Sequence, residues 1–158
     1  YNYKMLYIIL DNIRSTHNVG SIFRTSDAAG VSKIFLCGIT PSPVDRFGEP
    51  NPKLTKVSLG AENSVAYEKV GTTNAAIKKL KAEGFEILAL EQAENSISYK
   101  KYKYAKNKKV AIVLGTEVEG LKKTTLTLCD KILEIPMQGK KESLNVAVAY
   151  GILIFSLI

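Results

Sequence analysis

Short apolar runs alternate with longer amphipathic or small-residue stretches from one end of the chain to the other. The apolar runs suit buried β-strands, and the stretches between them suit helices that pack on a sheet. The pattern predicts an α/β domain with a parallel sheet, because strand–helix–strand units place successive strands parallel. We expect strands at residues 7–10, 34–37, 85–90, 110–114 and 132–135 and helices at residues 18–29, 73–82, 121–128 and 143–157, while residues 54–67 are ambiguous.

The composition indicates a folded domain that prefers an anionic partner. Hydrophobic residues make up 46% of the chain and charged residues 23%, which excludes a disordered or fibrous chain. Residues 1–158 have the length of a single domain. Lysine and arginine outnumber aspartate and glutamate by 22 to 15, and the formal net charge of +7 favours RNA, DNA or a phosphorylated ligand. The charge predicts binding and leaves the chemistry open.

Cysteine and histidine usage narrows the chemistry. Cys37 and Cys129 are too few for a disulfide framework and lack the spacing of metal ligands. Cys37 ends an apolar run, so we expect a buried free thiol and a reducing, cytoplasmic environment. His17 is the only histidine, which excludes a multi-histidine metal site. The longest apolar stretch, residues 146–155, is shorter than the roughly 20 residues of a membrane span, so no membrane partner is expected.

A first candidate site is the start of the helix predicted at residues 18–29. Asn18 can cap this helix, and Gly20 lets another backbone come close. Arg24 lies near the helical face of Gly20, and a guanidinium close to a helix start suits a phosphate. The alternative is an ordinary N-cap followed by a surface arginine.

A second candidate site follows the strand predicted at residues 110–114, in the turn that contains Gly115, Glu117 and Gly120. Ligands of open α/β sheets bind beyond the carboxyl ends of the strands, where glycine exposes backbone amides. Glu117 would lie in that crevice. The alternative is an ordinary strand-to-helix turn with solvated carboxylates. The sequence patterns of dinucleotide-binding and Walker phosphate loops are absent.

A third candidate site lies between the strand predicted at residues 132–135 and the last helix. Ser143 is a plausible N-cap for that helix. Asn145 falls in the first turn of an otherwise apolar helix, and its amide needs hydrogen-bond partners if it is buried. The alternative is that Asn145 only caps or solvates its own helix.

A fourth feature is the basic segment 99–109, in which Tyr99, Tyr102 and Tyr104 are interleaved with lysines. Basic residues alternating with aromatic rings suit single-stranded nucleic acid, because phosphates are attracted and bases stack. A charged linker is the alternative, and it is the commoner cause of such a run.

In this order the first three segments closely resemble the signature motifs of the SpoU (TrmH-like) RNA 2′-O-ribose methyltransferases of the SPOUT superfamily. The motif N-x-G-x-x-x-R is matched by Asn18, Gly20 and Arg24. The motif G-x-E-x-x-G after an apolar strand is matched by Gly115, Glu117 and Gly120. The motif I-P-M-x-G, followed by S-L-N-V, is matched by residues 135–139 and 143–146. Three ordered matches make coincidence an unlikely explanation.

The resemblance implies a fold, a cofactor and an assembly. The expected fold is α/β, a SPOUT-type parallel sheet flanked by helices with a C-terminal deep trefoil knot, which is rare among proteins. The expected methyl donor is S-adenosyl-L-methionine, with no metal. A homodimer is expected, and helix 143–157 is either part of its interface or buried within its own subunit. The residues that the resemblance places around the donor are Leu90, Leu114, Gly115, Ile135, Met137, Ser143 and Leu144.

The resemblance also implies a reaction, methylation of a ribose 2′-hydroxyl. The family places Arg24 at the hydroxyl, but a guanidinium stays protonated in proteins. We therefore expect Arg24 to hold the adjacent phosphate and stabilise the developing alkoxide, while the proton leaves through phosphate or water. The remaining residues expected to shape the ribose pocket are Asn18, Glu117, Ser143 and Asn145.

The substrate is the least determined part of this prediction. A ribose 2′-hydroxyl distinguishes RNA from DNA. A catalytic domain without an RNA-binding extension favours tRNA, although a first residue of Tyr1 leaves open that this is one domain of a longer protein. The alternatives are the catalytic domain of an rRNA methyltransferase, a non-catalytic RNA-binding domain with the same fold, or an unrelated α/β nucleotide binder.

Overall fold

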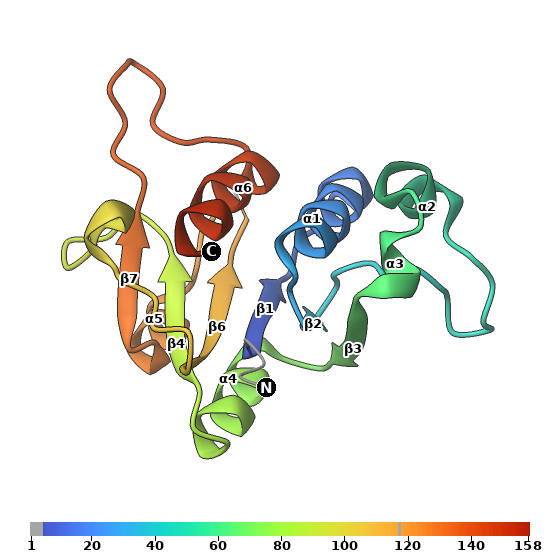
Figure 1. The fold of residues 1–158 in the computed structure, drawn as a ribbon. Helices are drawn as coiled ribbons and strands as arrows, with labels where there is room; N and C mark the ends of the chain where they lie inside the picture. The colour runs from blue at the N-terminus through green and yellow to red at the C-terminus, as the bar shows by residue number, and fades with distance from the viewer. Residues whose placement is uncertain (1–4, 117) are drawn as a thin grey trace.

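The computed structural model describes residues 5–116 and 118–158. Its strands form one sheet in the order β3-β2-β1-β6-β4-β7-β5, and neighbouring strands are parallel throughout (Figure 1). The parallel sheet predicted from the sequence is confirmed. The strands are β1 (Met5–Asp11), β2 (Lys33–Cys37), β3 (Ala66–Val70), β4 (Glu86–Leu90), β5 (Ile97–Ser98), β6 (Lys109–Leu114) and β7 (Lys131–Glu134).

Helices cover both faces of this sheet, with α1, α2 and α6 on one face and α4 and α5 on the other (Figure 1). Alternate residues of β1 point to the two cores: Ile8 and Leu10 pack under α1 and α6, and Ile9 packs under α4. The helices are α1 (Thr16–Ala29), α2 (Pro52–Ser58), α3 (Ala61–Ser64), α4 (Thr73–Ala82), the 3-10 helix η1 (Tyr99–Lys101), α5 (Lys123–Leu128) and α6 (Val146–Leu157).

The sheet register aligns the carboxyl ends of its central strands. Leu10 of β1 and Leu90 of β4 both pair with Leu114 of β6, and Leu133 of β7 pairs with Leu90. The loops that follow these strands therefore leave the sheet at one common edge. That edge is where open parallel sheets bind their ligands.

Two strands carry too little apolar signal to be predicted. The ambiguous residues 54–67 contain most of α2, all of α3 and the start of β3. β3 lies at one edge of the sheet and buries none of its side chains fully, so its sequence AYEKV shows no apolar run. β5 occupies the other edge and has only two residues. Edge strands bury fewer side chains than central strands, so their sequences contain fewer apolar residues.

The last helix begins later than predicted. Ser143 was expected as its N-cap, but the N-cap is Asn145, with φ −51° and ψ 137°. The Asn145 Oδ1 accepts hydrogen bonds from the amides of Ala147 at 2.9 Å and Val148 at 3.3 Å. Serine and asparagine cap helices about equally well, so the sequence could not choose between them.

The first helix begins earlier than predicted. Its N-cap is Ser15, whose Oγ accepts the amide of Asn18 at 3.1 Å, so Asn18 lies inside the first turn and is not the N-cap. The close approach expected at Gly20 is confirmed, because a Cβ there would lie 2.8 Å from the Leu54 carbonyl oxygen of α2. The Asn18 side chain instead accepts a hydrogen bond from Asn145, at the start of the last helix.

The tyrosines of segment 99–109 belong to the core. Tyr102 is only 8% exposed, and its hydroxyl donates to Glu86 Oε2 at 2.7 Å. Tyr99 and Tyr104 are partly buried against the same core as α1 and α6. Burial of Tyr102 therefore removes one of the three rings from the stacking interpretation. The lysines of the segment remain exposed, as in the charged-linker interpretation.

Cys37 is fully buried, as predicted. Within residues 5–116 and 118–158, no helix has the length and hydropathy needed to span a bilayer.

Candidate active site

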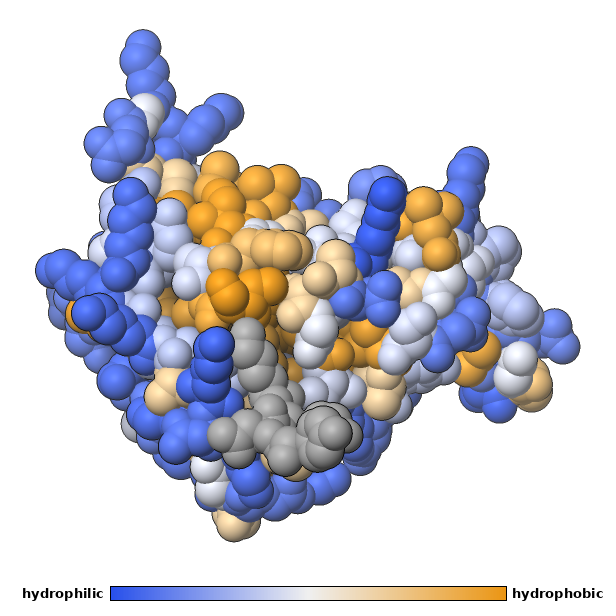
Figure 2. All heavy atoms as spheres, in the orientation of Figure 1, coloured by the Kyte–Doolittle hydropathy of each residue, from blue (hydrophilic) through white to orange (hydrophobic). Residues whose placement is uncertain are grey.

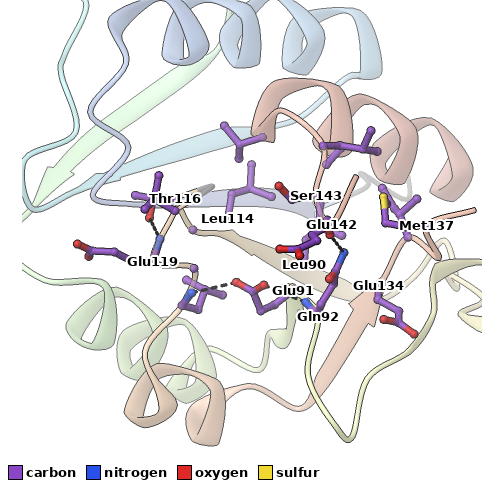
Figure 3. Close-up of a pocket in the computed structure, with 18 of the residues that line it drawn as sticks. Leu90, Glu91, Gln92, Leu114, Thr116, Glu119, Glu134, Met137, Glu142 and Ser143 are labelled. Carbon is purple, nitrogen blue, oxygen red and sulfur yellow. Dashed lines mark hydrogen bonds between the residues drawn. The ribbon is translucent and has the colours of Figure 1, made fainter. Parts of the chain in front are cut away.

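A cavity of about 390 Å³ opens at the carboxyl edge of the sheet. Three chain segments wall it: the end of β4 at residues 90–92, the turn after β6 at residues 114–121, and residues 134–144 between β7 and α6 (Figure 3). The residues predicted to surround the methyl donor all line this one cavity: Leu90, Leu114, Gly115, Ile135, Met137, Ser143 and Leu144. The structure thus brings together three segments that are far apart in the chain, while their role in binding the donor stays a prediction.

The turn after β6 is closed on itself. Thr116 and Gly120 form an antiparallel bridge in which the Gly120 amide donates to the Thr116 carbonyl at 3.0 Å. A Cβ on Gly115 would lie 2.9 Å from the Leu121 side chain, so only glycine fits without displacement. Gly120 has φ 63°, in the left-handed region that favours glycine. Glu117, predicted in this turn, lies outside the described residues.

Glu91 holds that turn against the end of β4. Its Oε2 accepts the backbone amide of Leu121 at 3.0 Å, and its Oε1 accepts the amide of Gln92 at 2.9 Å. A Cβ on Gly120 would come within 2.5 Å of the Glu91 Oε2, so the carboxylate lies directly against this turn. A charged acceptor makes stronger hydrogen bonds to amides than a neutral one.

Gln92 joins the same strand end to the third wall. Its Nε2 donates to the Glu142 carbonyl at 2.7 Å, immediately before Ser143 (Figure 3). Glu91 and Gln92 therefore connect all three walls of the cavity. Of the residues at this strand end, only Leu90 was predicted from the sequence. Glu91 and Gln92 could have been predicted as well, because they form a polar pair directly after a buried strand, at the edge where a parallel sheet binds ligands.

The cavity combines apolar and acidic walls. The aliphatic side chains of Leu90, Leu114 and Ile135 lie beside the carboxylates of Glu91 and Glu134. Glu119 and Glu142 also line it. An adenosine with a positively charged sulfonium group needs apolar surface for the base and negative charge for the cation. The residues present fit S-adenosylmethionine, and the volume lies within the usual range for small-ligand sites.

A hydrogen bond between two asparagines brings the first motif to the third. The Asn145 Nδ2 donates to the Asn18 Oδ1 at 3.1 Å, across 127 positions of the chain. Asn145 is flanked by Leu144 and Val146, which both line the cavity. The bond therefore anchors the start of α1 at the mouth of the cavity. Asn145 is exposed, so the burial that would have required partners for its amide is absent, and its side chain caps the helix as the alternative interpretation has it.

Arg24 lies farther along α1. It is exposed and does not line the cavity. Six residues separate it from Asn18, which is about 9 Å at the rise of an α-helix. Of the residues predicted to shape the ribose pocket, Ser143 thus lines the cavity, Asn145 lies between two lining residues and bonds to Asn18, and Arg24 lies outside.

Buried nucleophiles offer no alternative chemistry. Burial raises the pKa of the Cys37 thiol to about 11, so it stays protonated near neutral pH. Burial also raises the pKa of the Tyr150 hydroxyl, which hydrogen-bonds to the Ser26 hydroxyl at 2.7 Å between α6 and α1. Within the described ranges, no cluster of three His, Cys, Asp or Glu residues could hold a metal ion.

An all-parallel α/β sheet with a partly apolar and acid-lined cavity beyond its carboxyl ends is the arrangement in which open α/β proteins bind nucleotide-like ligands. The chain belongs to the SpoU rRNA Methylase family, whose profile matches residues 5–155. The resemblance seen in the three sequence motifs is therefore confirmed.

Individual relatives agree with this assignment. The 23S rRNA (guanosine-2′-O-)-methyltransferase RlmB of Escherichia coli strain K12 is 34% identical over 149 residues, which are 94% of this chain and 57% of the relative. The AdoMet-bound rRNA methyltransferase from Sinorhizobium meliloti is 30% identical, with a TM-score of 0.86 over 96% of this chain and 55% of that one. The A. aeolicus TrmH/SpoU tRNA modifying enzyme is 29% identical, with a TM-score of 0.82 over 98% of this chain and 74% of that one. The chain thus spans little more than half of the first two relatives.

Proposed function

We propose that this domain transfers a methyl group from S-adenosylmethionine to a ribose 2′-hydroxyl of RNA. One observation carries the proposal: the second and third motifs form the walls of a single cavity, and the Asn18–Asn145 hydrogen bond brings the first motif to its mouth. The AdoMet-bound relative from Sinorhizobium meliloti supports the choice of donor. When bound, the donor supplies an electrophilic sulfonium methyl group, so the chain has to align the hydroxyl and accommodate its proton.

Each part of the site has a separate task in this reaction. The turn after β6 and residues 135–144 hold the donor, mainly through backbone groups and aliphatic side chains. Asn18, Ser143 and Asn145 hydrogen-bond to the ribose and orient it, and Glu117 is proposed to assist them. Arg24 holds the neighbouring phosphate and stabilises negative charge on the reacting oxygen, because its guanidinium can donate two parallel hydrogen bonds.

The position of Arg24 suggests that a second copy of the chain completes the site. α6 exposes Val148, Ile152 and Phe155 at helical spacing, with 53%, 36% and 52% of their surface accessible. Figure 2 shows apolar surface gathered over this part of the molecule. We propose that α6 forms the homodimer interface and that Arg24 of one subunit serves the cavity of the other. The C-terminal deep trefoil knot implied by the family remains part of this proposal, and an experimental electron-density map traced through residues 110–158 tests it.

Ribosomal RNA is the substrate that the comparisons favour. The family profile is described for rRNA, and the RlmB relatives act on 23S rRNA by name. They support the rRNA alternative better than the tRNA substrate favoured by the sequence analysis. The A. aeolicus relative, described as tRNA modifying, keeps tRNA as the second candidate.

Two measurements test the proposal. Isothermal titration with S-adenosylmethionine should give saturable binding, whereas an unrelated nucleotide binder would give none. Labelled donor should then transfer its methyl group to 23S rRNA, and nucleoside analysis should find the label on a ribose. Transfer to tRNA alone would make tRNA the substrate in place of rRNA. Binding of donor and RNA without transfer would identify a non-catalytic domain and overturn the proposal.

A further inference from the structure

The loop between β2 and α2 displays an aromatic ring to solvent. Phe47 is 74% exposed, although phenylalanine is usually buried. The Arg46 guanidinium carbon lies 4.8 Å from the centroid of the Phe47 ring. A cation is thus held against an open aromatic ring.

Hydrogen bonds hold this loop in one conformation. Asp45 Oδ1 accepts the amides of Phe47 at 2.8 Å and Glu49 at 2.9 Å. The Asp45 amide donates to the Glu49 carbonyl at 2.8 Å, and Val44 and Pro50 form an antiparallel bridge. The ring is therefore presented by an ordered turn, and binding a partner there would cost little conformational entropy.

A hollow with hydrogen-bonding groups is lined by other residues of the same loop, among them Arg46, the neighbour of Phe47. It has a volume of about 670 Å³, and Arg46, Asn51, Tyr67 and Lys69 contribute to its lining. Lys69 also donates to the Thr40 carbonyl, which ties the hollow to the end of β2. Asp45 is the only acidic residue in its lining, and its carboxylate is engaged by the loop amides.

The loop starts from the same sheet edge as the candidate active site. β2 is separated from β6 by β1 alone, and all three strands are parallel. At about 4.8 Å between neighbouring strands, the starts of the two loops are roughly 10 Å apart. RNA that places a ribose at the cavity would therefore meet the start of the β2–α2 loop by running along this edge.

We propose that the β2–α2 loop binds an unpaired base of the substrate RNA by stacking on Phe47, while Arg46 holds the adjacent phosphate. The proposal rests on the RNA-methyltransferase function proposed above and adds a binding site to it. An unpaired base offers the flat face that an exposed ring needs, whereas a paired base is already stacked. Arg46 and Lys69 at the hollow and the net charge of +7 favour an anionic partner such as RNA at this loop.

Fluorescence anisotropy with two labelled RNAs tests this proposal: a hairpin with an unpaired loop and a fully paired duplex. Phe47→Ala should weaken hairpin binding about 5- to 100-fold, the effect of losing one stacked base. Phe47→Trp should restore it. Arg46→Gln should lower the slope of log affinity against log salt by about one unit, because one phosphate contact is lost. The control Lys78→Gln removes an exposed charge from α4, on the opposite face of the sheet. It should leave the ratio of hairpin to duplex affinity unchanged.

The outcomes separate this proposal from the proposed function. If the wild type neither binds RNA nor S-adenosylmethionine, the function itself fails. If the wild type binds both and Phe47→Ala binds the hairpin normally, only the loop site is wrong. If Phe47→Ala weakens binding of the hairpin and of the duplex equally, the loop site is also wrong. If Phe47→Ala changes the oligomeric state in size-exclusion chromatography, Phe47 is a protein contact and the loop site is wrong as well.

Discussion

At the scale of single residues, Asn145 divides its amide between two tasks. The Oδ1 accepts two amides of α6, so only the Nδ2 is left to donate to Asn18. Glu91 is divided in the same way between Leu121 and Gln92. In both cases one planar polar group connects segments that would otherwise move independently, and each connection can be broken by a separate substitution.

Asn145→Ser and Asn145→Ala separate two roles of Asn145, which are capping α6 and holding Asn18 in place. Serine keeps an acceptor for the helix but is too short to reach Asn18. The free energy of unfolding of the serine variant should therefore lie within about 0.5 kcal/mol of the wild-type value, while that of the alanine variant should be about 1 kcal/mol lower. Methyl transfer should fall in both variants, because both lose the bond to Asn18. Urea denaturation and labelled-methyl transfer measure the two effects. Full activity of the serine variant would show that the asparagine pair plays no part in catalysis.

Glu91→Ala should weaken S-adenosylmethionine binding by about tenfold, since the turn after β6 loses a charged acceptor worth about 1.5 kcal/mol. Calorimetric titration measures the dissociation constant. Glu94→Ala is the matched control, because Glu94 is an exposed carboxylate on the same connection. Equal affinities for wild type and Glu91→Ala would mean that the turn keeps its shape without the carboxylate.

The Cys37 thiol should make stability depend on alkaline pH. Its pKa is raised by burial from near 9 to about 11, so the folded state favours the neutral thiol. Its contribution to stability is fully present below pH 9 and is lost as the pH rises from 9 towards 11. Chemical denaturation between pH 8 and 11 should therefore show a shallower decline for Cys37→Ala than for wild type. Parallel curves would contradict the assignment to this thiol.

At the scale of elements, α6 has two different apolar faces. One face buries Tyr150, Leu153 and Leu157 against the domain, and the Tyr150 hydroxyl reaches Ser26 of α1. The other face leaves Val148 and Phe155 exposed. A helix that is apolar on all sides is normally buried on all sides. The exposed face is therefore the part of the fold that most needs a partner.

Phe155→Lys should convert a dimer into a monomer, because it places a charge in the apolar contact proposed for α6. Sedimentation or light scattering should show the mass halved, while donor binding persists. Leu59→Lys is the control, since Leu59 is 65% exposed and lies away from α6. A wild-type chain that is already monomeric would exclude this interface.

At the scale of the whole molecule, the cavity and Arg24 lie apart in one chain, and a dimer would bring them together. Arg24→Ala inactivates one half of such a site and Gly115→Val the other, since a side chain at Gly115 collides with Leu121. Coexpressed variants should recover about a quarter of wild-type activity, because half of the dimers are mixed and each has one intact site. Activity no higher than that of the parent variants would place Arg24 in the site of its own chain.

The sequence by itself determined the class of fold and the membership of the chain in its family. Central strands such as β6 are apolar on both faces, so composition alone marks them, and the residues around the cavity occur in short motifs that can be recognised without coordinates. The tertiary structure alone decided the rest. It paired Asn18 with Asn145 across 127 positions and placed Glu91 against Gly120. It also buried Tyr102, one of the three tyrosines that looked suited to RNA. Local patterns report how much of a side chain is buried, whereas contacts between distant segments depend on the path of the backbone, which no local pattern contains.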